Sequence, residues 1–101
     1  MDPNPCIPQL KALADETRWR IVRELLTSPL TVTQITDKLK APQYNISKHL
    51  RVLREAGIVT TQRHGKQVEC AVSPLFRSRW KKDQSTLDLG CCTFRFDRLP
   101  A

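Results

Sequence analysis

The chain has 101 residues, a length that suits one small domain. It is 40% hydrophobic and 27% charged, which argues against a wholly disordered chain. No run approaches the roughly eighteen apolar residues of a membrane span, and residues 1–10 lack a secretion-signal pattern, so we expect neither. The net charge of +7 and the pI near 9.7 indicate either a polyanionic partner, most often nucleic acid, or a merely soluble basic protein, and charge alone does not separate the two.

The excess charge is concentrated in the middle of the chain. Residues 40–66 contain six basic residues and one acidic residue, so this segment carries a net +5 of the total of +7. A solvated helix face usually alternates the two signs of charge. The run of one sign therefore indicates a binding surface.

The N-terminal part predicts an extended arm followed by two helices. Prolines in residues 1–7 favour the arm, and Leu10 and Leu13 have helical spacing after Pro8. Asp15 is placed to cap a second helix, which ends before Pro29. The apolar stripe expected for this helix is Trp19, Ile21, Val22, Leu25 and Leu26.

Residues 31–57 predict two short helices joined by a break at residues 40–42. Thr31 and Gln34 have the spacing of a capping box at the start of the first helix. The second helix, from about residue 42 to residue 56, buries Ile46, Leu50 and Leu53 and ends at Gly57.

The period then changes to that of strands. Residues 58–72 predict a two-stranded hairpin with its tip at His64-Gly65-Lys66, which we call the wing. Residues 74–83 predict a fifth helix, and residues 84–101 a cysteine-containing tail. The chain is therefore predicted to be one domain, mainly α with a small β-hairpin. This arrangement of about five helices plus a two-stranded wing is a winged helix-turn-helix.

Such a fold suits DNA, because a helix fits the major groove and its first half can present side chains to base edges. The candidate DNA-binding residues are Gln43, Tyr44, Asn45, Ser47, Lys48, His49 and Arg51 on the helix, with Arg63, His64 and Lys66 on the wing. Tyr44 could instead be a surface aromatic, and His49 could fill a packing gap. A module that docks protein or RNA is the alternative function, but the polar and basic start of the helix favours DNA.

Three segments resemble the ArsR/SmtB-type transcriptional regulators. Residues 10–22 resemble the opening of that family. Ser-Lys-His-Leu at residues 47–50 and Leu-Arg-Glu-Ala-Gly-Ile-Val at residues 53–59 resemble its recognition helix and first wing strand. Arg-His-Gly-Lys at residues 63–66 resembles the wing tip, and the similarity covers about residues 8–76.

The resemblance implies a cytoplasmic homodimer that represses transcription and releases double-stranded DNA when an inducer binds. It also implies that the first and last helices form the dimer interface. The residues that would do so here are Leu10, Leu13, Leu75, Phe76 and Trp80. Association would also bury faces that one small chain cannot cover.

Many members of the family bind metal ions, but two common sites are missing here. Residues 31–39 contain no cysteine, and the two histidines, His49 and His64, both lie in the DNA-binding region. Those two classes of sensor are therefore disfavoured.

The cysteines offer a different site. Cys70, on the second strand of the wing, is expected to pack as a small hydrophobic residue. Cys91 and Cys92 suit a soft ion such as arsenite or antimonite, with Cys6 on the arm as a third sulfur. A disulfide between neighbours is strained, and a reducing cytosol disfavours a structural bridge. Thiol redox switching and no ligand role are the alternatives, whereas an oxidoreductase is disfavoured because Cys-x-x-Cys spacing is missing.

Overall fold

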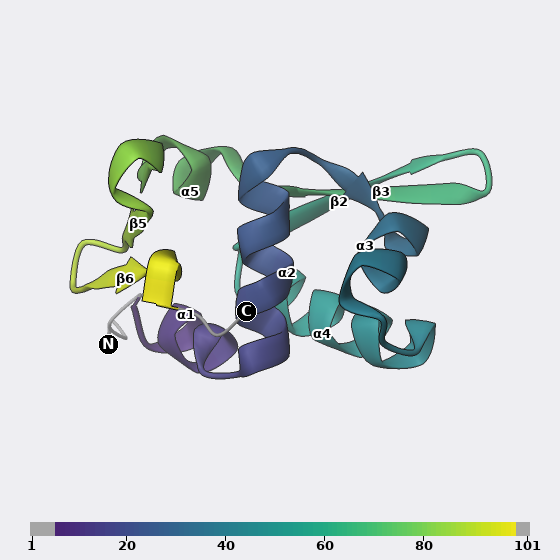
Figure 1. The fold of residues 1–101 in the computed structure, drawn as a ribbon, viewed down its shortest axis with the longest axis horizontal. Helices are drawn as coiled ribbons and strands as arrows, with labels where there is room; N and C mark the ends of the chain where they lie inside the picture. The colour runs from purple at the N-terminus through teal and green to yellow at the C-terminus, as the bar shows by residue number, and fades with distance from the viewer. Residues whose placement is uncertain (1–5, 99–101) are drawn as a thin grey trace.

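The computed structural model describes residues 6–98. The elements are α1 (Cys6–Leu13), α2 (Glu16–Thr27), β1 (Leu30–Thr31), α3 (Val32–Leu39), α4 (Gln43–Glu55), β2 (Val59–His64), β3 (Gln67–Val72), α5 (Pro74–Ser78), β4 (Trp80–Lys81), η1 (Lys82–Gln84), β5 (Thr86–Asp88), β6 (Thr93–Arg95) and η2 (Phe96–Arg98). Helix α2 runs through the centre (Figure 1). Helices α3 and α4 and the wing lie on one side of it, and α5 and strands β5 and β6 lie on the other. The predicted winged helix-turn-helix, mainly α, is confirmed.

Helix α2 forms where the capping and apolar patterns predict it. The carboxylate of Asp15 accepts a hydrogen bond from the Arg18 backbone N–H at 3.1 Å, which satisfies a free donor of the first turn. Ile21, Val22 and Leu25 are completely buried. The central position of α2 therefore follows from an apolar stripe that must be covered on more than one side.

The helix-turn-helix has the capping box that the sequence predicts. The Gln34 backbone N–H donates to the Thr31 hydroxyl at 3.1 Å, and the Thr31 N–H donates to the Gln34 side chain at 2.8 Å. In α4 the stripe of Ile46, Leu50 and Leu53 is buried, as expected. Gly57 follows with φ of +79°, a left-handed backbone that favours glycine and turns the chain into the wing.

The predicted two-stranded wing hairpin is confirmed, and a third strand that the sequence did not predict joins it in one sheet. Strands β2 and β3 pair antiparallel, with Val59 opposite Val72 and His64 opposite Gln67. Strand β1 pairs with the other edge of β3, with Leu30 opposite Cys70. A two-residue strand after Pro29 has no periodicity of its own, so only the long-range pairing reveals it.

The predicted fifth helix over residues 74–83 is wrong beyond Ser78. The chain leaves α5 there, and Trp80 begins β4, which pairs with β5. Strand β5 pairs in turn with β6, so the expected tail is a second three-stranded sheet, the C-terminal sheet (residues 80–98). The reason is non-local: Trp80 packs edge-on against Phe96, with ring centroids 5.9 Å apart.

The predicted arm of residues 1–7 is also corrected at its end. Helix α1 begins at Cys6, which is buried, and not at Pro8. Residues 1–5 lie outside the described residues, so that part of the prediction stays untested. Among residues 6–98, every helix is too short or too polar to cross a membrane.

Cys70 on β3 is fully buried in the core, as expected for a packing residue. Burial raises the pKa of the Cys70 thiol from 9.0 to about 11, because the thiolate would lose its hydration; nearby Arg54 acts in the opposite direction, and Glu69 adds to the rise. The thiolate is the reactive form of cysteine. Cys70 is therefore protonated and inert at neutral pH.

We predict that Cys70 resists alkylation by iodoacetamide at pH 7 in the folded protein, whereas the half-buried Cys92 is modified first. Peptide mass spectrometry after timed quenching measures both rates, and unfolding in urea should remove the difference. Modification of Cys70 at the rate of Cys92 in the folded chain would contradict the burial and the raised pKa.

Candidate nucleic-acid interface

Helix α4 presents one polar face to solvent, opposite its buried stripe. Gln43, Tyr44 and Asn45 are exposed in its first turn, and the Tyr44 side chain is 73% exposed. Ser47, Lys48 and Arg51 continue this exposed surface along the helix. Six of the seven candidate residues on the helix are thus free to meet a partner, because Ile46, Leu50 and Leu53 hold the opposite side in the core.

The charged groups on this face are held only loosely. The Lys48 ammonium lies 5.7 Å from the centre of the Tyr44 ring, a cation–π contact. Arg51 forms an ion pair with Glu55 at 3.1 Å, but both side chains are more than half exposed. Exposed ion pairs contribute little, so a phosphate can replace the Glu55 carboxylate as the partner of Arg51.

The wing tip lies beside the start of α4. A hollow of about 160 Å³ is lined by Thr31, Val32, Thr33, Gln43, Ser47, Lys66, Gln67 and Val68. Gln43 and Ser47 of the recognition helix and Lys66 of the wing therefore border one concave surface. Thr33 and Gln67 belong to it too, although the sequence did not single them out. The only signal for Thr33 was its place in the first turn of the helix that Thr31 caps.

The candidate residues of the wing tip extend this surface away from α4. Arg63, His64 and Lys66 are all exposed around the turn at Gly65, whose φ is +63°. His64 lies 3.5 Å from the Glu69 carboxylate on the facing strand. That carboxylate offsets part of the positive charge, so Arg63 and Lys66 are the stronger phosphate candidates of the wing.

His49 does not belong to the exposed face. Its ring is half-buried, and Nδ1 lies 3.3 Å from the Arg18 guanidinium of α2. Arg18 also donates to the backbone carbonyl of Ala12 at 2.6 Å and to that of Lys11 at 3.5 Å. The alternative reading of His49 as a packing residue is thus favoured, since Arg18 joins it to the end of α1.

Most candidate dimer residues are engaged inside the chain. Leu13 and Phe76 are buried in the core, which corrects their expected exposure to a partner. Leu10 and Trp80 are half-buried and pack against the core, and Trp80 lies on a strand and not on a helix. Leu75 remains available at 57% exposed.

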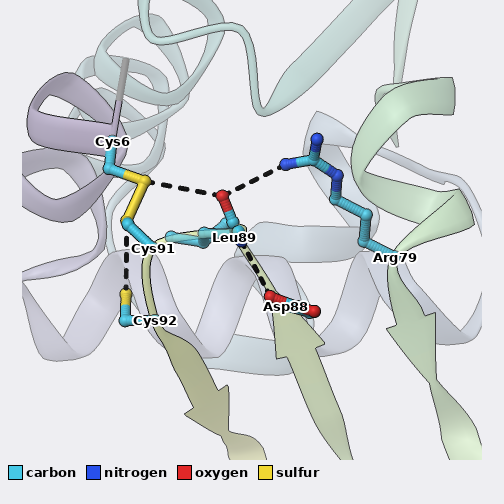
Figure 2. The surroundings of a disulfide bond; sticks show 7 residues. Cys6, Arg79, Asp88, Leu89, Cys91 and Cys92 are labelled. Atoms are coloured by element: carbon cyan, nitrogen blue, oxygen red, sulfur yellow. Dashed lines mark hydrogen bonds between the residues drawn. A yellow bond between two sulfur atoms is a disulfide. The ribbon is translucent and has the colours of Figure 1, made fainter. Parts of the chain in front are cut away.

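Three of the four cysteines, Cys6, Cys91 and Cys92, gather at the C-terminal sheet, where only Cys92 is a free thiol. Cys6 and Cys91 form a disulfide bond, a pairing that the sequence did not suggest (Figure 2). The Cys92 sulfur lies 3.8 Å from that of Cys91. Among residues 6–98 no group of three or more His, Cys, Asp or Glu side chains is arranged to hold a metal ion. Three sulfurs fit a thiophilic ion only after the bond is reduced, because disulfide sulfurs are not thiolate ligands.

Comparison with known proteins places the helix-turn-helix in a family. Residues 15–61 match the family described as "Bacterial regulatory protein, arsR family". The HTH-type transcriptional repressor SmtB of Mycobacterium tuberculosis strain H37Rv is 42% identical over 59 residues, which are 58% of this chain and 44% of that protein. The chain thus matches less than half the length of that relative. Cys6, Cys91 and Cys92 lie outside the family match.

Solved structures match a larger share of the chain than the family match does. HlyU from Vibrio cholerae superposes with a TM-score of 0.66 at 33% identity, covering 68% of this chain and 75% of that one. A structure titled "Possible transcriptional regulator for arsenical resistance" superposes with a TM-score of 0.64 at 34% identity, covering 76% of this chain and 88% of that one. The shared fold and the extent of this match agree with the residues of the recognition helix and wing. The chain therefore belongs to the arsR family of bacterial regulatory proteins.

Proposed function

We propose that the chain binds double-stranded DNA as a homodimer in the cytoplasm and represses transcription at a near-palindromic operator. The observation that carries the proposal is the single concave surface shared by the first turns of α4 and the wing tip. Helix α4 would enter the major groove, and Arg63 and Lys66 would reach the adjacent backbone. In a two-fold dimer, the half-sites would lie about one helical turn apart.

The net charge of +5 over residues 40–66 supports phosphate contact as the main source of affinity. If six or more phosphates are neutralised, affinity falls by about 10³-fold or more between 50 and 200 mM salt. Fluorescence anisotropy on a labelled duplex from the chain's own upstream region measures this slope. A flat response to salt would overturn the proposal and favour the alternative of a module that docks protein.

Lys48→Ala and Arg51→Ala are each expected to weaken DNA binding on every sequence. Each side chain is exposed on α4, and loss of one phosphate contact lowers the salt slope by about 1. Lys82→Ala is the matched control, because it removes an equal charge from the C-terminal sheet. Titrations at several salt concentrations give both the affinity and the slope. Equal losses in all three variants would show that net charge, and not this face, governs binding.

Gln43→Ala and Asn45→Ala are expected to relax sequence preference more than overall affinity. Amide side chains in the first turn can make paired hydrogen bonds to adenine, worth about 1–3 kcal/mol of discrimination each. The ratio of affinities for the operator and a scrambled duplex measures this change. Unchanged ratios in both variants would contradict the placement of α4 in the groove.

The three gathered sulfurs favour a second candidate function, release of DNA by arsenite, antimonite or another soft ion. After reduction, Cys6, Cys91 and Cys92 would supply three thiolates, a donor set suited to such ions. The resemblance to regulators of arsenical resistance supports this ligand class. The family match does not include these cysteines, so the support comes from their proximity.

In the fully reduced protein, arsenite is therefore expected to release DNA, and the double variant Cys91→Ser/Cys92→Ser should bind DNA but ignore arsenite. Isothermal titration calorimetry without DNA measures binding of the ion separately from release. Release that survives in the double variant would show that these cysteines are not the sensor.

A further inference from the structure

We propose that the Cys6–Cys91 bond is a thiol–disulfide exchange site whose substrates are small dithiols, and that its oxidation state sets the affinity of the chain for DNA. The second half of this proposal rests on the proposed DNA-binding function. It needs no metal ion, because the chemistry resides in the bond itself. The bond joins the first residue of α1 to the turn between β5 and β6 (Figure 2).

The turn that carries Cys91 is built by contacts that do not involve the bond. The Leu89 N–H donates to the Cys92 carbonyl at 2.9 Å, and the Arg79 guanidinium donates to the Leu89 carbonyl at 3.2 Å. The Gly90 N–H donates to the Asp88 carboxylate at 2.7 Å, and Gly90 has φ of +92°. These contacts remain when the bond opens, so the turn keeps Cys91 close to α1 for the bond to form again.

The Leu89 carbonyl also offers a place for the released thiol. The Cys6 sulfur lies 3.4 Å from this oxygen. In the bonded state the sulfur carries no proton, but the reduced Cys6 thiol can donate to the same oxygen. Both redox states thus have a defined partner for the buried sulfur.

Exposure determines which sulfur an incoming thiol attacks. Cys6 is only 5% exposed, whereas Cys91 is exposed. A thiolate of the dithiol attacks the Cys91 sulfur, the S–S bond breaks, and its electron pair leaves on Cys6, which takes a proton. The second thiol of the dithiol then attacks the mixed disulfide, and Cys91 leaves as a thiol. The net reaction turns one protein disulfide and one dithiol into two protein thiols and one cyclic disulfide, and it is reversible.

Helix α1 links this site to the recognition helix. Its first residue is bonded to the C-terminal sheet, and the carbonyls of Lys11 and Ala12 near its other end accept hydrogen bonds from Arg18. Arg18 in turn contacts His49 of α4. The sheet is also packed on α2, because Phe94 and Phe96 contact Trp19. With the bond closed, α1 is fixed at both ends and supports α4 from the core side.

Opening the bond leaves α1 fixed only at its Arg18 end. Helix α1 is then less ordered and must become ordered when DNA binds to α4. The conformational entropy lost in that ordering lowers the affinity for DNA. The oxidised protein is therefore the stronger DNA binder. We expect reduction to weaken binding by about 10-fold, within the range usual for coupled sites.

The test compares the full chain oxidised with excess glutathione disulfide, which accepts two electrons and leaves as two glutathione thiols, and reduced with dithiothreitol. Anisotropy on the operator duplex gives the dissociation constant, and alkylation with mass spectrometry gives the state of each cysteine. Cys6→Ser should show the weaker affinity under both conditions. Cys92→Ser is the matched control, because it removes the neighbouring thiol and keeps the bond, so it should respond like the parent chain.

The order of attack has its own readout, which does not depend on DNA. A short reaction with glutathione, a monothiol, should leave the mixed disulfide on Cys91; a mixed disulfide on Cys6 would overturn the assigned entry side. Cys91→Ser removes the same bond as Cys6→Ser from its other end. Circular dichroism on these two variants shows whether a loss of affinity is caused by misfolding.

The two proposals fail in different ways. Equal affinities of the verified oxidised and reduced forms would overturn the coupling while leaving DNA binding intact. If neither form binds DNA, the proposed function fails, and the coupling fails with it. An absence of the bond after oxidation would overturn the exchange site itself.

Discussion

The structure depends on the burial of α2 from several sides. Ile21, Val22 and Leu25 are completely buried, and burying an aliphatic side chain of this size contributes about 1.5–3 kcal/mol. Because α2 packs against α3 and α4 and also meets the C-terminal sheet through Trp19, it holds the two halves of the domain in one core. This shared helix therefore sets the position of the candidate nucleic-acid interface, on α4 and the wing, relative to the C-terminal sheet (Figure 1).

The interface is rigid where it is buried and adaptable where it is charged. Ile46, Leu50 and Leu53 fix the rotation of α4 about its axis, so Gln43, Asn45 and Lys48 face outward together. The side chains themselves have weak partners, as the exposed pair of Arg51 and Glu55 illustrates. Weak partners are exchanged at low cost for phosphates or bases, while the backbone that positions them stays in place.

Local patterns in the sequence were sufficient for the central part of the fold. The Asp15 cap, the Thr31–Gln34 capping box and the stripe on α4 each depend on residues within a few positions, and each forms as predicted. Contacts between distant residues were not predicted. No local periodicity predicts three such contacts: the pairing of Leu30 with Cys70, the packing of Trp80 on Phe96 and the bond from Cys6 to Cys91. The same limit explains why Leu13 and Phe76 seemed available to a partner but lie in the core.

By itself, therefore, the sequence determined the helix-turn-helix, the wing hairpin and most of the residues of the candidate nucleic-acid interface. Helical period, caps and glycine turns act over a few residues, so they can be read along the chain. Only the tertiary structure decided that Lys66 lies beside Gln43, that His49 turns to Arg18, and that Cys6 meets Cys91. Those contacts arise when the apolar faces of the helices and of both sheets are buried in one core, and that packing brings residues far apart in the sequence close together.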